Sequence, residues 1–277
     1  MNSRECVVKE QGKAIAAVTP STLKKPEAIL RAMYRKLSCA WGPQHWWPAE
    51  TPFEVIIGAI LTQNTSWTNV EHAIASLHSA GRLSVEGIRE VPQPKLEELI
   101  RSSGYFRQKA QRLRNFVAFL DTRHAGSLER MFAAPTECLR AELLALNGIG
   151  PETADSILLY AGNHAVFVVD AYTLRILERH EAVGTGAKYD EIRSLVERAL
   201  QREKPFLPLF DSSTGKRRPK VHSPSTMSTA ERSPLTQIYN EMHGLFVQVG
   251  KHYCHKSEPK CQICPLGFML RKPVISR

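Results

Sequence analysis

A short turn with two glycines is the part of the chain whose residue types most clearly suggest chemistry. Gly148, Ile149 and Gly150 follow a stretch of helical apolar spacing and precede Pro151, a residue that favours the first turn of a helix. The backbone N–H groups of such a turn, and of the helix after it, can bind a phosphate oxygen because no side chain holds the phosphate away. Taken alone, the turn fits equally well an ordinary corner between two helices with glycine at a C-cap.

An acidic residue follows the turn. Asp170 lies eighteen residues after Glu152, in the sequence Val-Val-Asp-Ala-Tyr. An aspartate directly before a helical pattern is typical of an N-cap, and a carboxylate near a phosphate-binding turn can also serve as an acid–base group. The two features together indicate a turn that binds nucleic acid, with an acid held near it.

The charge balance of the chain agrees with a polyanionic partner. Its 277 residues include 37 Lys and Arg against 27 Asp and Glu, a formal net charge of +10, and such an excess favours nucleic acid. No apolar run approaches the ~20 residues of a membrane span, and residues 1–25 have no hydrophobic core typical of a signal peptide. We therefore expect a cytoplasmic protein that does not contact a membrane.

Helices must position the turn and the acid. Apolar residues recur at helical spacing throughout residues 51–161, with breaks at glycine and proline, and this pattern predicts about six short helices. Further helices are predicted over residues 172–179, 190–200 and 235–251. The predicted fold class is therefore all-α.

Two domains are expected from this organisation. The first domain is a helical bundle of residues 48–162, which contains the helix–turn–helix hairpin formed around the Gly148–Gly150 turn. The second domain consists of residues from both ends of the chain, 26–47 and 163–277. Residues 1–25 are polar and aperiodic, which indicates a flexible tail. Residues 202–234 are rich in Ser, Thr, Pro and Lys, with a basic run at their centre, a composition typical of a flexible insertion.

Four landmarks occur in the order of one known family. They are Leu61–Thr65, the Gly148–Gly150 turn, Asp170 with its neighbours, and Gly250–Cys254. On these motifs, residues 26–270 resemble the helix-hairpin-helix DNA glycosylase superfamily typified by endonuclease III. The resemblance implies the two-domain endonuclease III-like fold, a monomer, and a location with the nucleoid in the bacterial cytosol.

The resemblance also implies roles for individual residues. The partner would be double-stranded DNA with a damaged base, bound through Gly148, Ile149 and Gly150. Gln63 would enter the gap that the flipped base leaves in the duplex, and this insertion offsets part of the free-energy cost of flipping. Alternatively, Gln63 is a plain surface glutamine. Asp170 would orient a water molecule and stabilise the cationic sugar that develops as the glycosidic bond breaks.

One departure from endonuclease III bears on the type of reaction. Bifunctional members of the family carry a lysine in the hairpin helix that forms a Schiff base at C1′ and leads to strand cutting. Glu152 stands at that position. A carboxylate cannot form an imine, so the sequence predicts a monofunctional glycosylase that uses water as its nucleophile.

The substrate class follows from a narrower resemblance. Trp46-Trp47-Pro48, and Trp67 after the Thr-Gln-Asn-Thr run, look like the bacterial 3-methyladenine DNA glycosylase III branch. This resemblance implies excision of alkylated purines in base-excision repair. Two alternatives stay open: a glycosylase for oxidised pyrimidines or mismatches, and a non-catalytic DNA-binding protein with the same hairpin.

The branch resemblance further implies a pocket for a cationic base. Trp46, Trp47 and Trp67 would line it, since a cation on an aromatic face gains about 0.5–2 kcal/mol, although tryptophans at such positions are also common in cores. Glu152 would accept a hydrogen bond from the base, or remain a solvated acid at a helix N-terminus. Lys251 would reach the pocket, or contact a phosphate on the surface.

Three cysteines near the end of the chain suggest a metal or cluster site. Cys254, Cys261 and Cys264 have the spacing of the first three ligands in the family's [4Fe–4S] loop, which uses four thiolates. The fourth position is Leu270, and no cysteine follows Cys264. A distant residue could complete the site, the cluster could be incomplete, or the loop could fold without metal; two nearby histidines make zinc a further alternative.

Overall fold

The computed structural model describes residues 25–205 and 222–270, and every regular element within these ranges is a helix. The all-α prediction is confirmed. The residues cluster into two compact units. The bundle unit contains Trp47–Val166 and Pro224–Arg232, and the terminal unit contains the other described residues. None of the described helices combines the length and the apolar character needed to cross a membrane.

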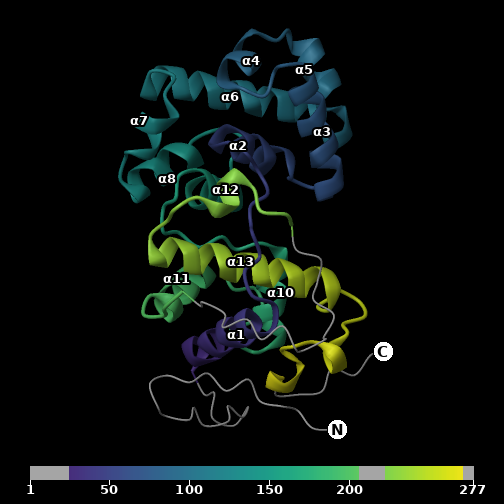
Figure 1. Ribbon diagram of the computed structural model, residues 1–277, viewed down its shortest axis with the longest axis vertical. Coiled ribbons are helices and arrows are strands. Elements are labelled where there is room, and N and C mark those ends of the chain that lie inside the picture. Colours follow the sequence, from purple (N-terminus) through teal and green to yellow (C-terminus); the bar gives the residue numbers. More distant parts are fainter. Residues whose placement is uncertain (1–24, 206–221, 271–277) are drawn as a thin grey trace. The chain divides into compact units, whose positions relative to one another are not determined.

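The bundle unit is built around one apolar helix. Every residue of α2 (Pro52–Leu61) from Val55 onward is buried. A helix that is apolar on all sides must lie inside the protein, and α2 packs against α3 (Trp67–Ser79), α6 (Phe106–His124) and α9 (Pro151–Ser156) (Figure 1). The unit also contains α4 (Val85–Glu90), α5 (Gln93–Leu99), α7 (Leu128–Phe132), α8 (Thr136–Leu144) and α12 (Thr226–Thr229), with the short helical segments η2 (Arg101–Ser103) and η3 (Ile157–Ala161).

The helix starts of the bundle unit follow from local sequence. The side chains of Thr51, Ser66, Ser84 and Ser127 each accept a hydrogen bond from a backbone N–H in the first turn of the following helix. Such N-caps stabilise a helix by about 1 kcal/mol each because they satisfy a donor that has no partner within the helix. At these four helices, a polar residue after the preceding apolar stretch therefore fixes where the helix begins.

The terminal unit joins helices from both ends of the chain. It contains α1 (Pro26–Trp41), α10 (Ala171–Arg179), α11 (Tyr189–Leu200) and α13 (Pro234–His252). Most of α13 is buried, and it packs against the other three helices (Figure 1). Two 3₁₀ turns, η4 (Cys261–Ile263) and η5 (Gly267–Met269), follow in the cysteine loop.

Part of the predicted flexible insertion is folded. The basic run at residues 216–220 lies outside the described residues, but Pro224–Arg232 belongs to the bundle unit and contains α12. Thr226 donates to the carboxylate of Glu50, and Arg232 donates to Asn163 at 3.0 Å. For these nine residues the prediction of a flexible insertion is wrong, because partners distant in the sequence order a segment whose composition is typical of a loop.

Candidate functional site

The hairpin turn connects α8 to α9 and has two glycines with different roles. Gly148 has a φ of +87°, which favours glycine, whereas Gly150 is extended at φ −93° and needs no special residue. Ile149 is buried, and its N–H donates to Leu146 O at 3.1 Å. Gly150 is exposed, and its N–H has no acceptor within the described residues. The turn therefore presents the N–H of Gly150 on the surface, where an anion can accept from it.

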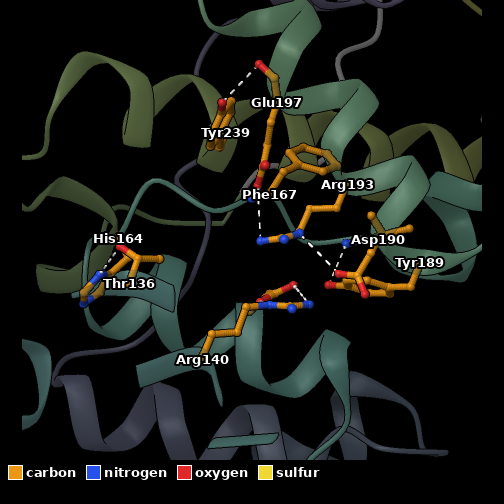
Figure 2. A network of polar contacts seen from close by, with 11 residues as sticks. Thr136, Arg140, His164, Phe167, Tyr189, Asp190, Arg193, Glu197 and Tyr239 are labelled. Atoms are coloured by element: carbon orange, nitrogen blue, oxygen red, sulfur yellow. Dashed lines mark hydrogen bonds and ion pairs between the residues drawn. The ribbon is translucent and has the colours of Figure 1, made fainter. Parts of the chain in front are cut away.

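A buried ion pair fixes the two helices of the hairpin to each other. Arg140 of α8 donates to both carboxylate oxygens of Asp155 on α9, at 2.7 and 3.2 Å, and both side chains are buried (Figure 2). A bidentate pair of this kind specifies orientation as well as distance. The two helices that flank the turn are therefore fixed to each other by a buried ion pair, which the spacing of apolar residues in the sequence did not predict.

Gln63 is bound to the hairpin. Its Nε2 donates to Gly148 O at 3.0 Å and to Thr153 Oγ1 at 2.8 Å, and its Oε1 accepts from Nη1 of Arg112. These contacts place Gln63 beside the turn, so two of the sequence landmarks meet within the bundle unit. The side chain is half-buried, and its hydrogen bonds join the turn, α9 and α6.

A buried lysine supports the segment that carries Gln63. Lys109 of α6 is only 1% exposed, and its Nζ donates to Leu61 O at 2.8 Å and to Ser103 O at 2.6 Å. Burial, with a smaller contribution from the nearby charge of Arg112, lowers the pKa of Lys109 to about 8. The ammonium thus satisfies a carbonyl at the end of α2, immediately before the glutamine segment.

Asp170 is the N-cap of α10. Its Oδ1 accepts from Thr173 N at 2.7 Å, and its Oδ2 lies 3.7 Å from Nε2 of His243 on α13. Burial lowers the pKa of His243, an effect that the charge of Asp170 opposes in part. The imidazole is therefore neutral near pH 7, so His243 places no positive charge beside the carboxylate.

The segment that leads to Asp170 is held by α11. Figure 2 shows Glu197 between Phe167 and Tyr239: the Glu197 carboxylate accepts from Phe167 N at 2.9 Å, and its backbone oxygen accepts from the Tyr239 hydroxyl at 3.2 Å. Two residues further on, Val169 N donates to the Tyr189 hydroxyl at 3.3 Å. The backbone before the aspartate is therefore fixed within the terminal unit.

The Gly250–Cys254 motif lies against the Asp170 motif. A Cβ added to Gly250 would stand 2.3 Å from the ring of Tyr172, so glycine is required for α13 to approach α10. The next residue, Lys251, places its Nζ 5.8 Å from the centre of the Trp46 ring, and that ring lies 6.3 Å from His243. Within the terminal unit, the Trp46 ring therefore lies near both Lys251 and His243, the histidine that faces Asp170.

The three tryptophans of the predicted pocket are divided between the two units. Trp46 belongs to the terminal unit, and Trp47 and Trp67 belong to the bundle unit, where their rings meet edge to face at 5.1 Å. Trp47 is 5% exposed and also contacts Tyr160 and Gly58, which is typical of a core residue. Trp67 is less deeply buried. Within the bundle unit, Trp67 is therefore the more exposed residue of the two.

Glu152 lies in the first turn of α9, and its side chain is exposed. The position is two residues past Gly150, next to the open N–H of the turn. A carboxylate there interacts favourably with the positive end of the helix dipole. The chemistry of this position is therefore that of an acid, with no amine to form an imine.

The cysteine loop does not supply a cluster ligand set. Within residues 25–205 and 222–270, no three His, Cys, Asp or Glu side chains are grouped closely enough to hold a metal. Burial raises the pKa of Cys261, and that of Cys264 to about 11, which favours neutral thiols over thiolates. Cys254 Sγ instead accepts from Arg179 at 2.9 Å, and Leu270 occupies the fourth position. Among the residues that the structure describes, the cysteine loop therefore does not supply the four thiolates of such a cluster.

Sequence reasoning missed Lys109, Arg112 and His243. Lys109 left a signal, since it continues the buried face of α6 one turn before Leu113 and a charge on such a face is unusual. Arg112 and His243 left none, because their partners come from elements far away in the sequence. The structure alone identifies them.

Comparisons with known proteins agree with this geometry. A family model described as "HhH-GPD superfamily base excision DNA repair protein" matches residues 57–202. A relative from Methanocaldococcus jannaschii, named "Putative DNA repair glycosylase MJ1434", is 41% identical over 247 residues, which cover 88% of this chain and 97% of the relative. Endonuclease III of Thermotoga maritima is 25% identical over 77% of this chain and 79% of its own.

Solved structures add the fold. The H. pylori 3-methyladenine DNA glycosylase MagIII, bound to 1,N6-ethenoadenine, has a TM-score of 0.62 and 29% identity, over 82% of this chain and 97% of that one. A trapped endonuclease III–DNA covalent intermediate has a TM-score of 0.66 at 20% identity, over 92% and 97%, and it supports the fold alone. Since the family model matches more than half of the chain, and a relative at 41% identity spans nearly all of it, the chain belongs to the HhH-GPD superfamily of base excision DNA repair proteins.

Proposed function

We propose that the chain is a monofunctional DNA N-glycosylase that releases alkylated purines of the 3-methyladenine type. The observation that carries the proposal is Glu152, an exposed acid in the first turn of α9, where a lyase of this family needs a lysine. Without an amine at this position, C1′ is left to attack by water, and the strand stays intact. The 29% identity to a 3-methyladenine DNA glycosylase supports the substrate class.

The proposed catalytic residue is Asp170. One carboxylate oxygen is used by the N-cap bond to Thr173, which fixes the direction of the group, and the side chain remains 13% exposed. His243 is neutral and adds no positive charge beside the carboxylate, which stabilises the cationic sugar and accepts the proton of an attacking water molecule in this proposal. The fixed backbone between Phe167 and Val169 holds that charge in place.

The proposed base contacts are aromatic and acidic. Alkylation gives a purine a positive charge and weakens its glycosidic bond, so contact with a tryptophan face favours the damaged base over neutral guanine by about 1 kcal/mol. We propose this role for the three tryptophans, of which Trp46 belongs to the terminal unit and Trp47 and Trp67 belong to the bundle unit. Glu152 supplies negative charge at the hairpin, and Lys251 lies over the Trp46 ring.

DNA binding is assigned to the hairpin. Gly148, Ile149 and Gly150 form the turn, the exposed N–H of Gly150 faces the phosphate, and Gln63 stands beside it to fill the space of the flipped base. We also propose that the protein is a monomer and that it is located with the bacterial nucleoid. The second expectation agrees with the net charge of +10, which favours binding to a polyanion such as DNA.

The test is a comparison of two damaged duplexes. Purified protein is incubated with DNA that contains 3-methyladenine and with DNA that contains thymine glycol, and free base and strand breaks are measured separately. We expect release of 3-methyladenine, abasic sites that break only after added alkali, and intact thymine-glycol strands. Strand cutting at thymine glycol without alkali would support the alternative, a glycosylase for oxidised pyrimidines, and DNA binding without any base release would support a non-catalytic protein.

A further inference from the structure

One arginine of α6 contacts both the hairpin turn and Gln63. Arg112 is half-buried, and its Nη1 donates to Oε1 of Gln63. A Cβ added to Gly148 would lie 2.2 Å from Arg112 Nε and 2.7 Å from its Cδ. Glycine at position 148 therefore does more than permit a positive φ, since it leaves the space that the arginine side chain occupies.

The contacts of Gln63 fix its side-chain amide completely. The NH₂ group faces two acceptors, Gly148 O and Thr153 Oγ1, and the carbonyl oxygen faces the guanidinium of Arg112. Rotating the amide by 180° would turn its carbonyl toward Gly148 O and its NH₂ toward a cation, so one orientation is strongly preferred. Arg112 supplies the contact on the carbonyl side.

The electrostatics of Arg112 do not indicate a role in folding. Within the described residues no carboxylate lies within ion-pair distance of its guanidinium, and its charge lowers the pKa of the neighbouring Lys109. A cation placed beside another cation, with a neutral amide as its partner, contributes little to stability. The contacts of Arg112 therefore indicate a role at the site around Gln63 and not a role in stabilising the core.

We propose that Arg112 is a positioning residue that holds the side chain of Gln63 against the hairpin, so that the group entering the duplex is ordered before DNA binds. The inference rests on the proposed function, in which Gln63 fills the space of a flipped base. A side chain that is already ordered does not lose conformational freedom on insertion, and this advantage is expected only where there is a base stack to enter.

The experiment compares duplex with single-stranded substrate. Arg112→Ala should lower the single-turnover rate of 3-methyladenine release from duplex DNA by roughly fivefold to tenfold, the amount expected for ordering one flexible side chain. Release from a single-stranded oligonucleotide of the same sequence should stay unchanged, because no gap is left to fill. In the Gln63→Ala background the Arg112→Ala change should have no further effect on the duplex rate.

Two further variants separate positioning from charge and from folding. Arg112→Lys keeps the positive charge but lacks the planar guanidinium, so it should behave like Arg112→Ala if positioning matters and like wild type if only charge does. Arg114→Ala is the matched control, since Arg114 is also half-buried on α6 but donates to Gln93 and to Val91 O, away from the hairpin. It should leave both rates unchanged.

Equal losses on duplex and single strand, or additive effects of the Arg112 and Gln63 substitutions, would overturn the inference. If wild-type protein releases no alkylated base at all, the proposed function fails, and the same double-mutant cycle is measured on affinity for a duplex with an abasic-site analogue. Coupled losses of affinity there would retain the role of Arg112, and additive losses would remove it.

Discussion

At the scale of single residues, the two oxygens of Asp170 are used differently. Oδ1 caps α10 through Thr173 N, and Oδ2 lies toward the neutral His243. Asparagine caps helices about as well as aspartate does, but it carries no charge. The structural and the catalytic contributions of the residue can therefore be separated by one substitution.

Asp170→Asn should lower the rate of base release by about 10²-fold or more, because a neutral amide neither accepts a proton from water nor stabilises a cationic sugar. The thermal midpoint and the affinity for abasic-site DNA should stay close to those of wild type. The measurements are single-turnover release of 3-methyladenine, thermal unfolding and a binding titration. Asp190→Asn, which makes the same change near the start of α11, is the control. An undiminished rate in Asp170→Asn would exclude Asp170 from the mechanism.

The two hairpin glycines should respond in opposite ways to alanine. Gly148→Ala places a Cβ at positive φ and into the side chain of Arg112, so we expect a loss of about 1–2 kcal/mol in the free energy of unfolding. Gly150→Ala meets nothing within 4 Å and should leave stability within about 0.5 kcal/mol of wild type. Because its new methyl group lies beside the exposed N–H, its DNA affinity should fall instead.

Urea unfolding and titration with abasic-site duplex measure the two effects side by side. A stable Gly150→Ala protein with wild-type DNA affinity would show that the phosphate does not approach the turn at this residue.

At the scale of elements, the hairpin depends on the buried pair between α8 and α9. Asp155→Ala would leave the guanidinium of Arg140 buried without its carboxylate, so we expect a loss of about 3–5 kcal/mol in the free energy of unfolding. The double substitution Arg140→Met with Asp155→Leu removes both charges and should recover most of that loss. Urea unfolding of the single and double variants tests this, and equal stability of the two would contradict it.

The helices of the chain could be predicted from its sequence because each has a local signal. Apolar spacing gave α10, α11 and α13 to within a residue at each end. The order of α12 could not be predicted, since it depends on Glu50 and Asn163, each more than sixty residues away in the sequence. The ion pair of Arg140 with Asp155 was not predicted for a related reason, because the sequence does not reveal which charged side chains become buried together.

The candidate site shows the same division. The glycine turn, Gln63 and Asp170 were predictable as residue types within motifs, and their neighbours Arg112 and His243 were not. Proximity in space decides whether an ordinary arginine or histidine bears on a site. The position of Trp67 at the edge and of Trp47 in the core of the bundle unit is likewise a result of packing that spacing does not encode.

At the scale of the whole molecule, buried histidines should make the fold sensitive to acid. Burial lowers the pKa of His180 to about 4 and also lowers that of His243. The unfolded chain therefore binds more protons than the folded one between about pH 6.5 and pH 4, and stability falls as the pH falls through this range. For His180 the full effect is about 3 kcal/mol, because its pKa falls from the ordinary value of 6.5 to about 4.

The free energy of unfolding, measured in urea at intervals from pH 7 to pH 4, checks this expectation. His180→Leu should make the decline shallower, and His78→Gln, a change at an exposed position of α3, should leave its slope as in wild type. A slope that His180→Leu does not alter would show that another group causes the acid sensitivity.

The order of the two units along the sequence has a consequence for folding during translation. Most of the bundle unit is one continuous segment, Trp47–Val166, so it can begin to fold while the ribosome is still translating the later codons. The terminal unit cannot, because α1 at its start packs against α11 and α13, the last of which ends at His252. The apolar face of α1 therefore stays uncovered until α11 and α13 have been synthesised. A chaperone that binds exposed apolar segments of a nascent chain would act on α1 first.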